Sequence, residues 1–251
     1  MTTRRTLVAA NWKMNGNKET VASLLTAFKS GMNGSSDVAV FPPALYVAQA
    51  AELLKDTDIA YGVQNVSAEA SGAFTGELSL SMVKEFDCQY ALIGHSERRE
   101  LFGETDAQIA QKVKATLESG VIPMLCIGET LAQRESGVTE DVVRTQIQAV
   151  LDAVGIAAFD TIVVAYEPVW AIGTGKTASP EQAQEVHAFI RGMLAAEDAA
   201  VAAKTRILYG GSVKAASAEA LFGQPDIDGG LVGGASLIAD EFVAICNAAK
   251  G

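Results

Sequence analysis

The feature that most constrains the fold of this chain is a repeat in which a short apolar segment is followed by a polar or glycine-rich cluster and then by a helical pattern. Eight such units occur, with strands expected at 6–10, 37–41, 59–63, 90–93, 121–127, 206–209 and 229–232, and at a run from Thr161 that leads to Glu167. Alternating strands and helices predict a parallel sheet, and eight units close into a barrel. We therefore expect an α/β protein with a single (β/α)8 barrel domain over residues 1–251.

Several helix boundaries are marked by capping signals. Thr105 with Gln108 forms a capping box for one helix, and Gly120 is placed to end it. Ser179 is the expected cap of a later helix, with Pro180 at its first position.

Composition and charge exclude several classes of protein. A net charge of −11 argues against general binding to nucleic acid or to an anionic membrane. The apolar runs are far shorter than the ~20 residues of a membrane span, and the N-terminus lacks the apolar stretch of a secretory signal. Cys88, Cys126 and Cys246 are odd in number and form no CxxC pair, so we expect reduced thiols and a cytoplasmic protein.

Glu167 stands at the end of a strand, because Pro168 has no amide hydrogen with which to continue it. The segment that follows has bulky apolar residues and then Gly173-Thr174-Gly175, a composition typical of a lid with a bendable end. We interpret Glu167 as a base that works beneath a closing lid. The alternative is a structural role, in which the Glu167 carboxylate only caps the chain end of the strand or forms an ion pair.

His95 and Lys13 also follow strands, and the carboxyl ends of barrel strands meet at one mouth. A carboxylate, an imidazole and an ammonium suit proton abstraction next to a carbonyl, with His95 and Lys13 stabilising the oxyanion. A short helix starting at Ser96 would favour a neutral imidazole on His95. The alternative role of His95 is a hydrogen-bonded core residue, and that of Lys13 is a surface charge. Glu97 is the expected partner of a basic residue such as Lys13, with a catalytic role as the alternative, and we assign His187 to the core.

Glycine-rich loops at the same mouth indicate an anion site. Backbone amides at Gly173, Ser212, Gly233 and Gly234, with the N-terminus of a helix near Ser236, suit a phosphate. Any one of these glycines alone could simply turn the chain.

Other phosphate or carbonyl chemistries fit less well. Gly175-Lys176-Thr177 ends like a P-loop, but Trp170 stands where that motif needs its first glycine. A Schiff-base aldolase would require a lysine within a barrel strand, and the expected strands contain none. A metal site would require several histidine or acidic ligands, and only His95 and Glu167 are well placed.

The connection from Ser67 to Leu78 is long and carries an aromatic residue, Phe74, near its tip. Such a loop either folds back on its own domain or enters a partner, and we favour the partner.

Taken together, these motifs resemble the triosephosphate isomerase family along nearly the whole chain. The matching segments are Asn11-Trp-Lys-Met-Asn15, Gly72-Ala-Phe-Thr-Gly-Glu77, Ile93-Gly-His-Ser-Glu-Arg-Arg99, Cys126-Ile-Gly-Glu129, Ala165-Tyr-Glu-Pro-Val-Trp-Ala-Ile-Gly-Thr-Gly-Lys176, Tyr209-Gly-Gly-Ser212 and Leu231-Val-Gly-Gly-Ala-Ser236. The pairing of a carboxylate base with a neutral histidine is the standard description of that family.

The resemblance implies a TIM barrel that interconverts dihydroxyacetone phosphate and D-glyceraldehyde 3-phosphate through an enediol(ate), in glycolysis and gluconeogenesis, without metal or organic cofactor. By match of motif, Glu167 is the base, His95 the electrophile, Lys13 the cation and Asn11 a positioning residue, and the phosphate is bound at Gly173, Ser212, Gly233 and Gly234. Pro168 to Lys176 resembles the closing lid.

The resemblance also implies a homodimer in which the Gly72 to Glu77 loop enters the neighbouring subunit, with Thr75 near its Asn11 and Lys13. Two alternatives stay open: another phosphosugar isomerase or epimerase on the same barrel, and a catalytically silent barrel that serves as a binding protein.

Overall fold

The computed structural model describes residues 4–171 and 178–249. Within these residues eight parallel strands pair in chain order, and β1 pairs with both β2 and β8 to close a barrel. The expected fold class is confirmed. The strands are β1 Leu7–Asn11, β2 Asp37–Phe41, β3 Ile59–Val63, β4 Tyr90–Ile93, β5 Ile122–Ile127, β6 Val163–Tyr166, β7 Ile207–Tyr209 and β8 Gly229–Val232.

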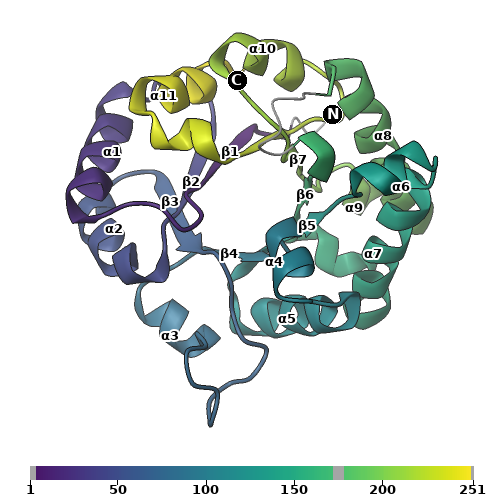
Figure 1. Ribbon diagram of the computed structural model, residues 1–251, viewed down its shortest axis with the longest axis horizontal. Helices are drawn as coiled ribbons and strands as arrows, with labels where there is room; N and C mark the ends of the chain where they lie inside the picture. The colour runs from purple at the N-terminus through teal and green to yellow at the C-terminus, as the bar shows by residue number, and fades with distance from the viewer. Residues whose placement is uncertain (1–3, 172–177, 250–251) are drawn as a thin grey trace.

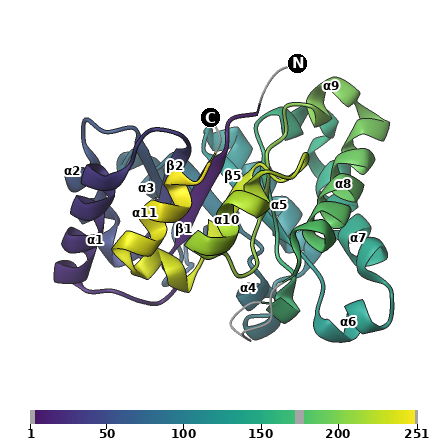
Figure 2. The same ribbon diagram turned by 90° about the horizontal axis from the view of Figure 1, so that it is seen from above.

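Helices form a ring around the strands (Figure 1). The helices are α1 Lys18–Gly31, α2 Val47–Leu54, α3 Leu80–Glu85, α4 Ser96–Leu101, α5 Asp106–Ser119, α6 Leu131–Glu135, α7 Thr139–Val154, α8 Pro180–Glu197, α9 Ala199–Ala202, α10 Ala215–Phe222 and α11 Ala239–Asn247. Figure 2 shows the short helices α4 and α6, which directly follow β4 and β5, at one end of the barrel. None of the helices traced in the described ranges is long and apolar enough to cross a membrane.

Local capping signals fix several of these helices. The Thr105 side chain accepts from the Gln108 amide, and the Gln108 side chain accepts in return from the Thr105 amide. Gly120 ends α5 with a φ of 83°, a left-handed conformation that suits glycine. Ser179 and Gln182 form the same reciprocal pair at the start of α8, next to Pro180. These predictions are confirmed.

The core has two parts. One cluster fills the barrel interior with side chains such as Phe41, Leu92 and Met124, and a larger one packs the outer faces of the strands against the helices. Burial of each large apolar side chain stabilises the fold by about 1.5–3 kcal/mol. Cys126 belongs to the interior cluster, and all three cysteines are unpaired and buried.

Some boundaries differ from those expected. β6 ends at Tyr166, although the Glu167 amide still donates to the Ile127 carbonyl over 2.7 Å before Pro168 stops the ladder. The helical segment after β2 begins as a 3₁₀ turn, η1 at Ala44–Tyr46, which is followed by α2. The short helix α3 was not expected, because its six residues are too few for a clear period.

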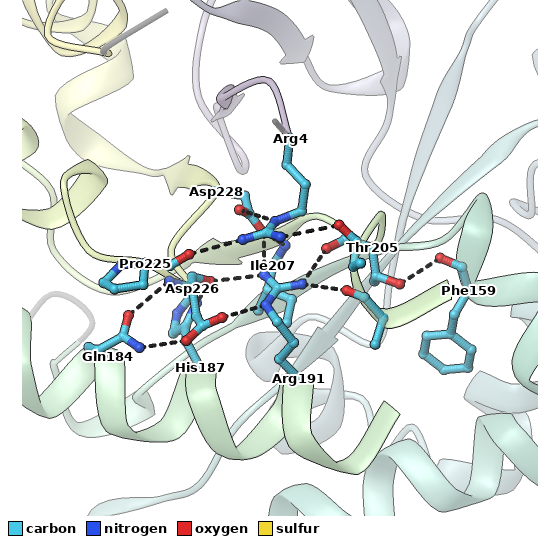
Figure 3. A network of polar contacts seen from close by, with 12 residues as sticks. Arg4, Phe159, Gln184, His187, Arg191, Thr205, Ile207, Pro225, Asp226 and Asp228 are labelled. Carbon is cyan, nitrogen blue, oxygen red and sulfur yellow. Dashed lines mark hydrogen bonds and ion pairs between the residues drawn. The ribbon is translucent and has the colours of Figure 1, made fainter. Parts of the chain in front are cut away.

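A polar network ties α8 to the segment before β8 (Figure 3). The Arg191 guanidinium pairs with Asp226 at 2.6 Å and with Asp228 at 2.7 Å, and donates to the Ala202 carbonyl. Arg4 pairs with the other oxygen of Asp228 at 2.6 Å. Because Asp228 precedes β8, the network closes the barrel at the amino ends of its strands, away from the mouth.

Candidate active site

A pocket of about 410 Å³ opens at the carboxyl ends of the strands. It brings together most of the side chains and loops that the sequence singles out: Asn11, Lys13, His95, Glu167, Ser212, Gly233 and Gly234. Gly173 falls outside the described residues. The expectation that polar clusters after β1, β4, β6, β7 and β8 share one mouth is therefore met for the described residues.

Glu167 lies at the floor of this pocket and is only 2 % exposed. Its Oε1 is 2.9 Å from His95 Nε2, and its Oε2 accepts from the Ser96 amide over 3.0 Å. Two glycines make this position possible. A Cβ on Gly210 would lie 2.8 Å from Glu167 Cγ, and a Cβ on Gly128 only 1.8 Å from the Glu167 carbonyl oxygen. The contact between Gly128 and Glu167 is not visible in the sequence, because the two residues lie on different loops.

His95 caps the N-terminus of α4, as the short helix expected at Ser96 implies. The Glu97 amide donates to His95 Nδ1 over 3.2 Å, so the ring proton of a neutral imidazole is on Nε2, facing Glu167. Burial lowers the pKa of His95, while the ionised Glu167 raises it, and the net direction is upward. Protonation of Nδ1 would break the hydrogen bond that this atom accepts from the Glu97 amide. The raised pKa therefore depends on the negative charge of Glu167.

Lys13 adopts a left-handed backbone with a φ of 52°, which is unusual for a residue with a side chain. Two bonds hold it: the Asn11 side chain accepts from the Lys13 amide over 3.0 Å, and Gln64 Nε2 donates to the Lys13 carbonyl over 2.8 Å. Lys13 Nζ pairs with Glu97 Oε1 at 2.6 Å. The predicted Glu97 partnership is confirmed, whereas the backbone strain and the support from Gln64 were missed.

The loops after β7 and β8 are shaped by close contacts. A Cβ on Gly211 would lie 2.2 Å from Tyr209 Oη, so only glycine fits there. Gly233 lies beside the Lys13 side chain, with a built Cβ 3.5 Å from its Cε. Ser236 Oγ donates to the Gly233 carbonyl over 2.6 Å and fixes the 3₁₀ turn η4, Gly234–Leu237.

The segment after Glu167 is anchored by a carboxylate that sequence reasoning did not assign. Glu129 is fully buried and accepts from Trp170 Nε1 over 2.9 Å and from the Tyr166 hydroxyl. Arg134 pairs with Glu129 and lies over the Trp170 ring, 4.8 Å from its centroid. The segment Cys126-Ile-Gly-Glu129, which follows a strand, was the only sequence feature that pointed to this carboxylate. Of the expected lid, Pro168 to Lys176, residues 172–176 lie outside the described residues.

The described part of the chain holds no group of three His, Cys, Asp or Glu side chains placed to ligate a metal. The charged groups of the pocket are instead arranged for proton transfer. A buried carboxylate faces an imidazole N–H, and a lysine stands beside them.

Comparison with known proteins shows to which family the chain belongs. The family model described as triosephosphate isomerase matches residues 6–249. The chain belongs to the triosephosphate isomerase family. Proteins named triosephosphate isomerase from Thiobacillus denitrificans and Dechloromonas aromatica are 61 % and 57 % identical, over 98 % of this chain and 99 % and 100 % of their own lengths. That from Hydrogenovibrio crunogenus is 55 % identical over 98 % of both chains. The chain is thus an isomerase of this family, and the resemblance in its motifs is confirmed.

Proposed function

We propose that this protein interconverts dihydroxyacetone phosphate and D-glyceraldehyde 3-phosphate, as a step of glycolysis and gluconeogenesis, with no metal or organic cofactor. The observation that carries the proposal is the contact between Glu167 Oε1 and His95 Nε2, 2.9 Å apart in a pocket that also contains Lys13 and the glycine loops. A buried carboxylate beside an N–H donor can remove a proton from carbon while the donor stabilises the charge on oxygen.

In the proposed reaction Glu167 takes a proton from the carbon next to the carbonyl, and the electron pair moves onto the carbonyl oxygen to give an enediolate. His95 Nε2–H donates to that oxygen and passes protons between the two oxygens, while Lys13 balances the negative charge and Asn11 holds the Lys13 amide. Glu167 then returns its proton to the neighbouring carbon. The carbonyl carbon is reduced to an alcohol and the neighbouring carbon is oxidised to a carbonyl, so the reaction is an intramolecular oxidation–reduction with no net change for the molecule.

The negative charge of Glu167 moves to the substrate during this reaction. An ionised Glu167 raises the pKa of His95, but the carboxyl group loses its charge when it accepts the substrate proton. The enediolate that forms in the same step carries the negative charge instead, while the Glu97 amide still donates to His95 Nδ1. Because the Glu97 amide donates to Nδ1, a neutral ring has its N–H at Nε2, and we propose that this N–H donates to the enediolate oxygen.

The phosphate group is proposed to bind the backbone amides at Gly173, Ser212, Gly233 and Gly234. Pro168 to Lys176 is the proposed lid, and its first part is anchored through Trp170 and Glu129. Closure would exclude water and hold the phosphate in the enediolate plane, which opposes its elimination.

The working form is proposed to be a homodimer in the cytoplasm, built from one barrel domain per chain. Figure 1 shows the connection between β3 and α3, which contains Gly72 to Glu77, projecting beyond the ring of helices. Its Phe74 is 45 % exposed, and Met14 and Leu45 are 94 % and 89 % exposed. A second pocket, of about 370 Å³, is lined by Lys13 and Met14 and by Gly76 and Glu77 at the end of the same loop. We propose that it receives the partner's Thr75 and Phe74.

The test is isomerisation of glyceraldehyde 3-phosphate by the purified protein in deuterated water, followed by proton NMR. Dihydroxyacetone phosphate that carries deuterium at the carbon that received the proton is the expected product. A folded dimer that gives no turnover would overturn the proposed function and leave the catalytically silent barrel.

A further inference from the structure

The pocket must attract an anion although the protein carries a net charge of −11. Among its described lining residues three carry a formal charge: Lys13, Glu167 and Lys214. Lys13 is paired with Glu97 at 2.6 Å, and Glu167 adds a negative charge on the floor. Part of the positive charge of Lys13 is thus offset before any anion arrives.

Lys214, unlike Lys13, has no ion-pair partner among the described residues and lies on the rim of the pocket. It is exposed on the rim of the pocket, in the loop between β7 and α10, two residues after Ser212. In residues 4–171 and 178–249 it takes part in no ion pair. Glu241 lies at the N-terminus of α10, and its Oε1 accepts from the Ala215 amide over 2.8 Å. That carboxylate is engaged by the helix backbone.

We propose that Lys214 is the rim cation that draws the phosphate dianion of the substrate into the pocket. This rests on the proposed function, because the anion is the phosphate ester of that substrate. A single charge at the mouth of a low-dielectric cleft raises the local concentration of an oppositely charged ligand, and the effect falls with salt. Lys214 acts before the chemical step and touches none of the reacting atoms.

The experiment compares Lys214→Gln with wild type in steady-state kinetics across ionic strength. At about 0.01 M salt the Debye length is about 30 Å, so kcat/KM of Lys214→Gln should fall roughly threefold, with kcat within a factor of about two. Above about 0.3 M the two proteins should converge. Lys214→Arg, which keeps the charge, should match wild type at every salt concentration.

Lys55→Gln is the matched control, because Lys55 is exposed but follows α2 at the amino ends of the strands. It makes the same change in net charge and should leave kcat/KM unchanged. Equal losses for Lys55→Gln and Lys214→Gln, or a loss at Lys214 that does not depend on salt, would overturn the proposal.

A second readout does not need turnover. Titration of the protein with inorganic phosphate, followed by NMR, should show weaker binding to Lys214→Gln at low salt only. Absence of turnover by wild type would refute the proposed function, whereas equal phosphate binding by both proteins would refute the role of Lys214.

Discussion

His187 is expected to make the fold sensitive to mild acid. Its side chain is fully buried on α8 between the rings of Tyr166 and Tyr209, and its Nδ1 lies 3.2 Å from the Asp226 carbonyl oxygen. Burial, helped by the positive charge of Arg191, lowers the pKa of His187 to about 4, against an ordinary value of about 6.5. Figure 3 shows it within the network of Asp226 and Arg191.

The direction and size of the effect follow from proton linkage. Between about pH 6.5 and 4 the unfolded chain binds a proton at this residue and the folded chain does not, so stability falls as the pH falls through this window. With these two pKa values the contribution lost between about pH 7.5 and 5 is about 2 kcal/mol. His95 works in the opposite direction, because its pKa is raised on folding, so its contribution is present at low pH and is lost as the pH rises through the folded pKa.

The assay is urea unfolding of wild type and His187→Asn at several pH values between about 7.5 and 5, at one fixed protein concentration. Asparagine keeps an amide N–H for the Asp226 carbonyl but cannot take up a proton. The variant will be less stable at neutral pH because it leaves a cavity, so the relevant quantity is the change of stability with pH. Wild type should lose about 2 kcal/mol more than the variant on acidification.

The chain contains only two histidines, so the comparison is clean. Curves for wild type and His187→Asn that run parallel from neutral to acid pH would refute the reasoning, since they would mean that His187 titrates equally in the folded and unfolded states. His95→Asn serves as the second comparison and should change the pH dependence in the opposite sense.

Three further predictions concern the site and the surface. Glu167→Asp withdraws the base by one methylene and should lower kcat roughly 100-fold or more, with little change in inhibition by a phosphate-bearing ligand; equal losses would make Glu167 a binding residue. Gly211→Ala should cost about 1–3 kcal/mol of unfolding free energy in a denaturant titration, whereas Gly192→Ala on α8, where a Cβ meets nothing within 4 Å, should cost nothing or stabilise. Phe74→Asp should shift the protein towards monomer in sedimentation velocity, and an unchanged dimer would exclude this loop as the main contact.

The sequence was informative wherever a physical signal is local. Capping residues such as Thr105 and Ser179 act within one turn of helix, so their effect is visible in a few letters. Pro168 ends a strand in any context. The position of polar clusters after strands also predicts the mouth, because parallel strands of a barrel all end on one side.

The least predictable features of the site depend on distant partners. Glu129 was not assigned a role, since its contacts with Tyr166 and Trp170 join the loop after β5 to the end of β6 and the segment that follows it. The requirement for Gly128 was equally hidden, because the atom that excludes a side chain there belongs to Glu167.

The sequence by itself determined the order of strands and helices, the closed barrel and the set of residues at its mouth, because periodicity, caps and chain breaks act over short distances. The tertiary structure alone decided that Glu167 meets His95 at 2.9 Å, that Nδ1 of His95 is occupied by an amide, and that Lys13 is held at a positive φ beside Glu97. These features require atoms from separate strands to approach within hydrogen-bond distance. Such distances are set by how the whole barrel closes and packs, and no short stretch of sequence contains them.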